Sequence, residues 1–217
     1  MNTDSLFFPI IDNGGRISFT DWGYSLFHSA LAGCFTGRQT HLGRISYAYP
    51  SGAMNHATEL FLASGADRMI VVDTDQSFTP QDMRLLLSHD LPLVAGMYCK
   101  KKPGMEFTLS SLDNENPFTD DPQRILDNPL VEVARVSRGF INIHRSVFES
   151  MLPTVDVIQD IQTETEIRDW WKPYPNGHSE DFAFSDRYRE LGGKIFVDQR
   201  IRIGHWGPIE FPIKGTY

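Results

Sequence analysis

Two aspartates in one short stretch, Asp73 and Asp75, have the residue type and spacing that could bind a metal ion. They follow the apolar run 69–72, whose β-branched residues predict a buried strand. Ligands of open α/β sheets bind at the carboxyl ends of strands, so we expect both carboxylates to lie at a site. Two hard oxygen ligands this close together suit Mg²⁺ or Mn²⁺ carried with a phosphate group. Aspartate after a strand is also common in turns and helix caps, so the pair alone leaves a structural role open.

Glu180, Asp181 and His205 are the other candidates for chemistry. The two acidic residues begin a predicted helix. There the helix dipole stabilises them, or one of them is held rigidly as a general base. Adjacent helical side chains point about 100° apart, so only one can face a cleft well. Asp181 lies nearer the boundary of the apolar face and is the predicted base, with Glu180 as an acceptor-orienting group or a helix-end charge. A lone histidine such as His205 is often structural, yet two aspartates, one histidine and substrate phosphates would make a Mn²⁺ site.

Alternating strands and helices must position these residues. Apolar patterns, caps and turn residues predict strands at 6–11, 44–49, 69–72, 93–98, 131–136, 140–143, 194–198 and 201–203. They predict helices near 20–34, 51–64, 80–87, 145–152 and 180–191, and a long surface loop at 104–128. Strand–helix alternation is typical of a parallel sheet. We therefore expect an α/β protein with a central mixed sheet, mostly parallel in its N-terminal half.

Three segments allow two interpretations each. Residues 12–15 form a tight turn or a loop against a nucleotide. The lysine run 100–102 is a solvated surface or, through Lys100, a contact for a diphosphate. The aromatic residues of 153–177, Trp170 and Trp171 among them, are satellite core or a lid over a sugar.

The bulk properties exclude several classes of protein. A chain of 217 residues is long enough for one sizeable core, and one domain over 1–217 is expected. The net charge of −8 argues against nucleic acid as a partner. No apolar run approaches the roughly 20 residues of a membrane span, and the N-terminus lacks the basic region of a signal peptide. Two cysteines exclude a disulfide framework and a four-cysteine zinc site, so a reducing, cytoplasmic setting is expected.

The motifs also occur in a recognisable order. Asp73–Asp75 is followed by the segments 94–98, 138–148, 179–182 and 192–198, and then by His205. In this order they resemble the small GT-A-fold nucleotide-sugar glycosyltransferases of bacteria, phages and large viruses, over nearly the whole chain. The chain departs from that family at Met54, where an arginine frequently precedes the residue equivalent to Asn55.

The resemblance implies a single GT-A-like, Rossmann-like domain whose N-terminal part binds the donor and whose C-terminal part binds the acceptor. It implies transfer of a sugar from a nucleoside-diphosphate sugar, with a UDP-sugar favoured, to a hydroxyl of a glycan, a lipid-linked molecule or another acceptor. The reaction would depend on Mn²⁺ or Mg²⁺ and invert the anomeric centre. Metal ligands would be Asp75, His205 and Asp73, the last also a candidate for ribose. Asp181, or else Glu180, would be the base, and the donor site would draw on Pro9, Ile10, Asp12, Asn55, Thr74, Lys100 and Gly139.

Two other functions stay open at this point. A nucleotidyltransferase shares such a sheet and paired metal carboxylates, but it usually has a Gly-rich basic loop after the first strand. Residues 12–16 match that loop only in part. The third class is a noncatalytic module that binds a nucleotide or a sugar.

Overall fold

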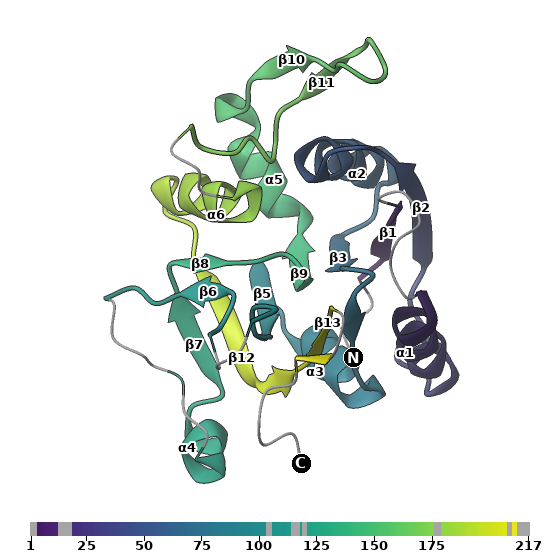
Figure 1. Ribbon diagram of the computed structural model, residues 1–217. Coiled ribbons are helices and arrows are strands. Elements are labelled where there is room, and N and C mark those ends of the chain that lie inside the picture. Colours follow the sequence, from purple (N-terminus) through teal and green to yellow (C-terminus); the bar gives the residue numbers. More distant parts are fainter. Residues whose placement is uncertain are drawn as a thin grey trace.

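The computed structural model describes residues 4–12, 19–102, 106–113, 118, 121–175, 179–207 and 210–211. A seven-stranded sheet forms its centre, in the order β2-β1-β3-β9-β5-β12-β7 (Figure 1). The strands are β1 (Leu6–Asp12), β2 (Thr40–Ser46), β3 (Arg68–Val72), β5 (Leu93–Met97), β7 (Leu130–Val133), β9 (Phe140–His144) and β12 (Ile195–Arg202). The α/β class and the mixed sheet predicted from the sequence are confirmed.

The direction of each strand decides which residues meet. β1 pairs in parallel with β2 and β3, and β5 pairs in parallel with β12. β9 lies between β3 and β5 and is antiparallel to both, while β7 is antiparallel to β12. Strands β1, β2, β3, β5 and β12 therefore all run in one direction, and their carboxyl ends lie along one edge of the sheet.

Helices cover both faces of this sheet (Figure 1). On one face are α2 (Pro50–Ser64), α5 (Arg145–Met151) and α6 (Glu180–Glu190); on the other are α1 (Phe19–Leu31) and α3 (Pro80–Ser88). Side chains of β3 alternate between the two cores: Met69 and Val71 pack toward α2, and Ile70 and Val72 toward α3. This alternation explains why the strand reads as a continuous apolar run, because a strand covered on both faces has no polar side.

Local signals set the ends of the helices. Thr79 and Asp82 form a capping box at the start of α3, with Pro80 in the first turn. The Thr79 N–H donates to Asp82 Oδ2 at 2.8 Å, and the Asp82 N–H donates to Thr79 Oγ1 at 3.2 Å. α2 ends at Gly65, whose φ of 74° is the left-handed conformation that glycine adopts most easily.

Several predicted elements have other bounds in the structure. The second strand is at Thr40–Ser46 rather than 44–49, because the chain leaves the sheet before Pro50 begins α2. The segment 131–136 is divided into β7 and β8 (Arg135–Val136). The two strands predicted at 194–198 and 201–203 are the single strand β12, Ile195–Arg202, whose register is irregular between Val197 and Arg202. The predicted loop 104–128 contains β6 (Leu109–Ser110) and α4 (Pro122–Asp127).

The two adjacent tryptophans belong to the core, so the interpretation as a lid over a sugar is wrong. Trp170 and Trp171 are 0% and 1% exposed. Trp171 stacks on Phe184 of α6 with ring centres 4.1 Å apart, and Trp170 meets Phe148 of α5 edge to face. Apolar rings with no access to solvent hold α5 and α6 together and cannot contact a ligand.

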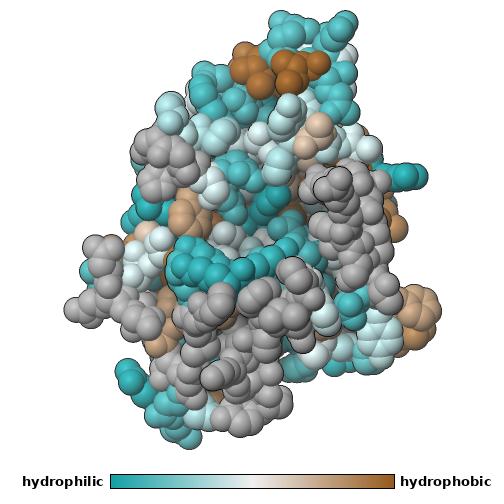
Figure 2. All heavy atoms as spheres, in the orientation of Figure 1, coloured by the Kyte–Doolittle hydropathy of each residue, from teal (hydrophilic) through white to brown (hydrophobic). Residues whose placement is uncertain are grey.

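A hairpin of β10 (Val157–Gln159) and β11 (Glu166–Arg168) extends beyond these helices (Figure 1). Figure 2 shows an apolar patch at this end of the molecule, and the exposed apolar residues of the hairpin are Val157, Ile158 and Ile161. Among the helices in the described part of the chain, none has the length and apolar character needed to cross a membrane. Cys34 and Cys99 form no disulfide.

Candidate functional site

The carboxyl edge of the sheet gathers most of the residues singled out from the sequence. Asp73 and Asp75 follow β3, a lysine run follows β5, and His205 follows β12. Because β9 is antiparallel, the residues before its first residue, Arg138 and Gly139, arrive at the same edge. Four strands thus contribute to one place from segments far apart in the sequence.

A small second sheet joins the end of β12 to the end of β3. β13 (Gly204–Trp206) pairs antiparallel with β4 (Gln76–Ser77), so His205 lies opposite Gln76. The Trp206 N–H donates to the Asp75 carbonyl oxygen at 2.8 Å. These backbone bonds hold His205 beside Asp75 although 130 positions separate them in the numbering.

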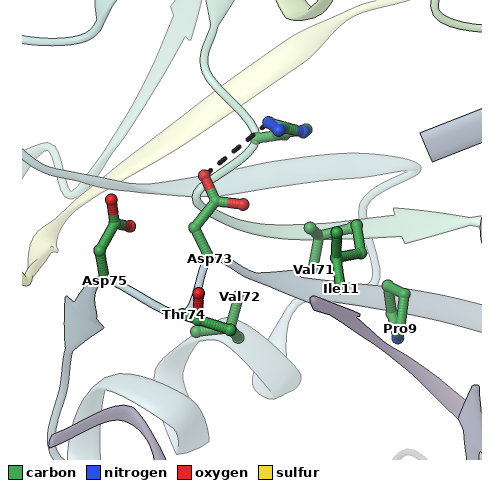
Figure 3. Close-up of a pocket in the computed structure, with 8 residues that line it drawn as sticks. Pro9, Ile11, Val71, Val72, Asp73, Thr74 and Asp75 are labelled. Carbon is green, nitrogen blue, oxygen red and sulfur yellow. Dashed lines mark ion pairs between the residues drawn. The ribbon is translucent and has the colours of Figure 1, made fainter. Parts of the chain in front are cut away.

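A cavity of about 190 Å³ opens beside the two aspartates (Figure 3). Its lining residues are Pro9, Ile11, Val71, Val72, Asp73, Thr74, Asp75 and Arg138. The side nearest β1 is apolar and the opposite side carries charge, as Figure 3 shows for Pro9 and Ile11 against Asp73 and Asp75. A ligand with a flat, weakly polar part and an anionic part bound through a divalent cation would match these two sides.

Two nitrogen-bearing side chains face one carboxylate oxygen of Asp75. The Lys101 ammonium and His205 Nε2 both face Asp75 Oδ2, with Nε2 3.5 Å away. The other oxygen, Oδ1, is buried and has no hydrogen-bond partner among the described residues. Burial raises the pKa of Asp75, but hydrogen bonds from His205 and Lys101 outweigh burial and leave that pKa below its ordinary value. Asp75 is therefore ionised near neutral pH.

Asp75 and His205 together fit a divalent cation. His205 Nδ1 lies 2.8 Å from the Cys99 carbonyl oxygen. A carbonyl only accepts, so Nδ1 donates to it, and Nε2 is the nitrogen that faces Asp75 and could bind a metal ion. This is the usual arrangement of a metal-binding histidine, and the unpartnered Oδ1 adds a free oxygen ligand. No cluster of three or more His, Cys, Asp or Glu side chains is arranged for metal binding in the described part of the chain, so further ligands would have to come from outside this pair.

A buried arginine connects Asp73 with the start of α6. Arg138 Nη1 lies 3.8 Å from Asp73 Oδ2, and Arg138 Nη2 lies 3.7 Å from Glu180 Oε1 (the Asp73 pair is dashed in Figure 3). The Arg138 backbone N–H donates to Asp181 Oδ2 at 3.3 Å. Burial lowers the pKa of Arg138, but the carboxylates of Asp73, Asp181 and Glu180 more than offset burial and keep it raised and charged. The arginine therefore holds together acidic groups that would otherwise repel one another.

Acidic groups outnumber the strong cations here, and this shifts the pKa values. Burial raises the pKa of Asp73 above its ordinary value, and Arg138 counters it, while Asp75 and Asp181 act in the same direction as burial. Burial also raises the pKa of Tyr98, with contributions from Asp73 and Asp181. A bound cation would relieve this excess of negative charge.

Gly139 has a packing reason to be glycine. A Cβ at this position would lie 2.5 Å from Tyr98 Oη and 2.8 Å from Gln76 Nε2, both closer than real contacts allow. The Gly139 N–H donates to Tyr98 Oη at 2.9 Å, and its carbonyl accepts from the Asp73 N–H at 2.9 Å. The predicted approach of a sugar to Gly139 is a separate role, which the packing neither requires nor prevents.

The other predicted donor residues are not all at the cavity. Pro9 and Thr74 line it, whereas Ile10 packs on the opposite face beside the α1–α3 core, because side chains alternate along β1. The Asn55 amide donates to Asp169 and accepts from the Trp171 N–H, both at 2.9 Å, so Asn55 anchors the tryptophan segment. Lys100 pairs with Glu106. Asp12 ends β1, and residues 13–16 of the predicted loop lie outside the described residues.

Sequence reasoning missed Arg138 and Lys101 as site residues. Lys101 is part of the lysine run that the sequence indicated, but the run gives no sign of which member turns inward. Arg138 directly precedes Gly139 and a short strand. This position indicates a site residue only once β9 is known to run antiparallel. Neither assignment follows from local sequence, because both depend on which strands are neighbours.

Comparisons with known proteins concern the fold. The sequence matches no known family profile and no curated protein sequence. Among solved structures, A197 from STIV matches with a TM-score of 0.54 at 14% identity, over 94% of this chain and 86% of that one. This chain therefore shares its fold with A197.

Two enzymes match with lower scores. The catalytic domain of Drosophila β1,4-galactosyltransferase 7 with xylobiose has a TM-score of 0.46 at 15% identity, over 90% of this chain and 64% of that one. A UDP-glucose pyrophosphorylase with UDP-glucose has a TM-score of 0.48 at 11% identity, over 91% and 90%.

Proposed function

We propose that this protein is a metal-dependent glycosyltransferase that moves a sugar from a nucleoside-diphosphate sugar, with a UDP-sugar favoured, to an acceptor hydroxyl. We place the donor on the N-terminal part of the 1–217 domain and the acceptor on the C-terminal part. The observation that carries this proposal is one edge where Arg138 lies between two groups of residues. Asp73 faces Arg138 from the first group, which also contains the Asp75–His205 pair, and Glu180 and Asp181 form the second group.

The first group suits the diphosphate end of a donor. Asp75 and His205 would hold Mn²⁺ or Mg²⁺, and Asp73, which pairs with Arg138, would be a further ligand or a ribose contact. The bound ion would neutralise the charge that develops on the departing nucleoside diphosphate. The apolar wall of Pro9 and Ile11 would lie against the nucleobase.

The second group suits the acceptor. Asp181 is largely buried at the first turn of α6, a rigid element, and the Arg138 N–H fixes one of its oxygens. Asp181 would take the proton of the acceptor hydroxyl as that oxygen bonds to the anomeric carbon and the bond from that carbon to the diphosphate breaks. Attack from the face opposite the leaving group inverts the anomeric centre. Glu180, more exposed than Asp181, would orient the acceptor.

Calorimetric titration of the purified protein with UDP, with and without Mn²⁺, tests this proposal. We expect UDP to bind in the presence of Mn²⁺ and Asp75→Asn to weaken that binding at least tenfold. Asp156→Asn is the matched control, because Asp156 is an exposed carboxylate that pairs with Lys172 on the surface. Equal UDP affinity in the wild type and Asp75→Asn would contradict the metal-site assignment.

A donor panel then identifies the reaction. Incubation with UDP-sugars and GDP-sugars should release nucleoside diphosphate, and mass spectrometry of added acceptor glycans should show one additional sugar. Pyrophosphate released from a nucleoside triphosphate and a sugar phosphate would instead identify a nucleotidyltransferase. Binding without turnover of any donor or triphosphate would identify a noncatalytic module.

A further inference from the structure

The lysine run after β5 divides into two kinds of residue. Lys100 and Lys102 both pair with Glu106, on the outside of the segment. Lys101 turns the other way and pairs with Asp75. Among the described residues, therefore, two lysines share one exposed carboxylate and the lysine between them reaches the candidate metal ligand.

The backbone enforces this division. The Lys100 N–H donates to the Glu106 carbonyl oxygen at 2.8 Å, and Cys99 forms a β-bridge with Phe107. The Lys102 N–H donates to the Lys100 carbonyl oxygen at 2.8 Å, so the chain turns tightly at Lys101. Glu106 thus fixes the segment on both sides of Lys101, and the turn directs the Lys101 side chain to the site.

Lys101 and a divalent cation would use the same carboxylate. The ammonium contacts Asp75 Oδ2, the oxygen that also faces His205 Nε2. Two cations at one carboxylate repel each other, so a metal ion bound between Asp75 and His205 would drive the ammonium away. The Lys101 side chain is 34% exposed and flexible, and it can leave. A diphosphate bound to the ion would offer the displaced ammonium a new anionic partner.

We propose that Lys101 holds the place of the cation at Asp75 in the ligand-free protein and transfers to the diphosphate when ion and nucleotide bind together. This inference rests on the proposed function, and it couples the binding of the ion to the binding of the nucleotide at that site. The ion alone must break the Lys101–Asp75 pair without compensation, whereas ion and nucleotide together replace it with a Lys101–phosphate pair. The two ligands therefore bind cooperatively, each strengthening the other by the same factor.

Removal of the ammonium should change the two affinities in opposite directions. In Lys101→Met, Mn²⁺ alone no longer competes with an internal cation and should bind about tenfold tighter, a typical size for a coupling of this kind. UDP added at saturating Mn²⁺ loses its ammonium partner and should bind about tenfold weaker. A lysine that merely stabilises the segment would not tighten Mn²⁺ binding, and a general electrostatic effect of the lysine run would appear in Lys102→Met as well.

Titration calorimetry on the wild type, Lys101→Met and Lys102→Met measures both affinities. Lys102→Met is the matched control, because it removes the same charge from the same run but leaves the Asp75 pair in place. We expect it to change each affinity less than threefold. Lys101→Gln provides a second, polar replacement, and thermal unfolding of each variant shows that the fold is kept.

The outcomes distinguish a failure of this inference from a failure of the proposed function. Opposite changes in Lys101→Met and Lys101→Gln, absent from Lys102→Met, support the exchange. If the wild type binds UDP with Mn²⁺ but the Lys101 variants match Lys102→Met, or change both affinities in one direction, the exchange is wrong and the proposed function stands. A wild type that binds neither Mn²⁺ nor UDP overturns both.

Discussion

A buried arginine lies among acidic groups at each end of strand β3, and the two arginines differ in how completely they are hydrogen-bonded. At the start of the strand, Arg68 is 1% exposed and donates to Asp4 Oδ2 at 2.5 Å and to Asp90 Oδ1 and the Leu91 carbonyl at 3.0 Å. Beyond the end of the strand, Arg138 approaches its carboxylates only at 3.7 and 3.8 Å, and its Nε has no partner among the described residues. Every guanidinium nitrogen of Arg68 donates a hydrogen bond, whereas the Nε of Arg138 donates none within the described part of the chain.

The polar groups at the amino end of β3 stabilise the fold, whereas those at its carboxyl end are left available to a ligand. A buried donor without a partner costs free energy, and a protein retains such groups where a ligand can satisfy them. Gln76 adds to this pattern, since both polar atoms of its buried amide lack partners among the described residues, whereas the Asn142 amide beside Arg68 donates to the Leu86 carbonyl at 3.1 Å. In the described part of the chain, most buried side-chain polar atoms without a hydrogen-bond partner, those of Asp75, Gln76, Arg138 and Trp206, lie at the carboxyl end, where the proposal places substrate.

The largest effect should come from the base at the carboxyl end. Asp181→Asn keeps the size of the side chain and removes its basicity, so turnover should fall by about 10² to 10⁴ with the donor and acceptor that the panel identifies. Donor affinity should change little, because the proposed role concerns the acceptor. Glu180→Gln is the comparison variant: its amide can still hydrogen-bond to the acceptor, so it should lose less activity than Asp181→Asn. Activity lost in Glu180→Gln but retained in Asp181→Asn would exchange the two roles.

The next effect should be on stability, at the amino end. Arg68→Met removes the bonds to Asp4, Asp90 and Leu91 and should lower the free energy of unfolding by about 3 kcal/mol. Urea unfolding followed by fluorescence of the buried tryptophans measures this loss. UDP binding by the folded fraction should be unchanged, and a loss of affinity there would contradict the separation of the two ends.

Arg138→Met should also destabilise the protein, by about 2 kcal/mol near neutral pH, but with a different pH dependence. Arg138 counteracts the burial that raises the pKa of Asp73, so without Arg138 that pKa rises further. An acid whose folded pKa is raised destabilises the fold when ionised, and this cost disappears as pH falls toward the ordinary carboxyl value. Urea unfolding at pH 7.5, 6 and 5 should therefore show the cost shrinking for Arg138→Met and staying constant for Arg68→Met. A loss of stability that does not change with pH in either variant would contradict the conclusion that Arg138 offsets an excess of acidic groups.

The smallest expected effect is a gain in stability. Gln76→Met replaces an amide without partners by an apolar side chain of similar size, so it should leave stability unchanged or raise it by up to about 1 kcal/mol. Asn142→Leu, the matched change at the bonded end, should cost about 1–3 kcal/mol. A clear loss of stability in Gln76→Met would show that its amide already has a structural role.

The sequence predicted the parts of the site that depend on local signals. The run 69–72, the Thr79 cap and Gly65 are local features, and they place Asp73 and Asp75 at the end of a buried strand as expected. Which strands are neighbours depends on residues far apart in the chain, so the antiparallel β9 between β3 and β5 was not predicted. The inward turn of Lys101 rather than Lys100 depends on Glu106. Trp170 and Trp171 could not be assigned to core or lid without knowing that Phe148 and Phe184 face them.

The position of β9 also sets the order in which the nascent chain can fold. Strands β3 and β5 are complete by Met97, but neither pairs with the other, because β9 must enter between them. At about 5–20 residues per second, a ribosome needs roughly 3–10 s to synthesise the roughly 50 further residues that reach the end of β9. During that interval both strands expose unpaired edges, which are templates for association with other chains. A chain that stops before Phe140 would keep those edges permanently, so residues 1–139 should aggregate when expressed without the rest of the chain.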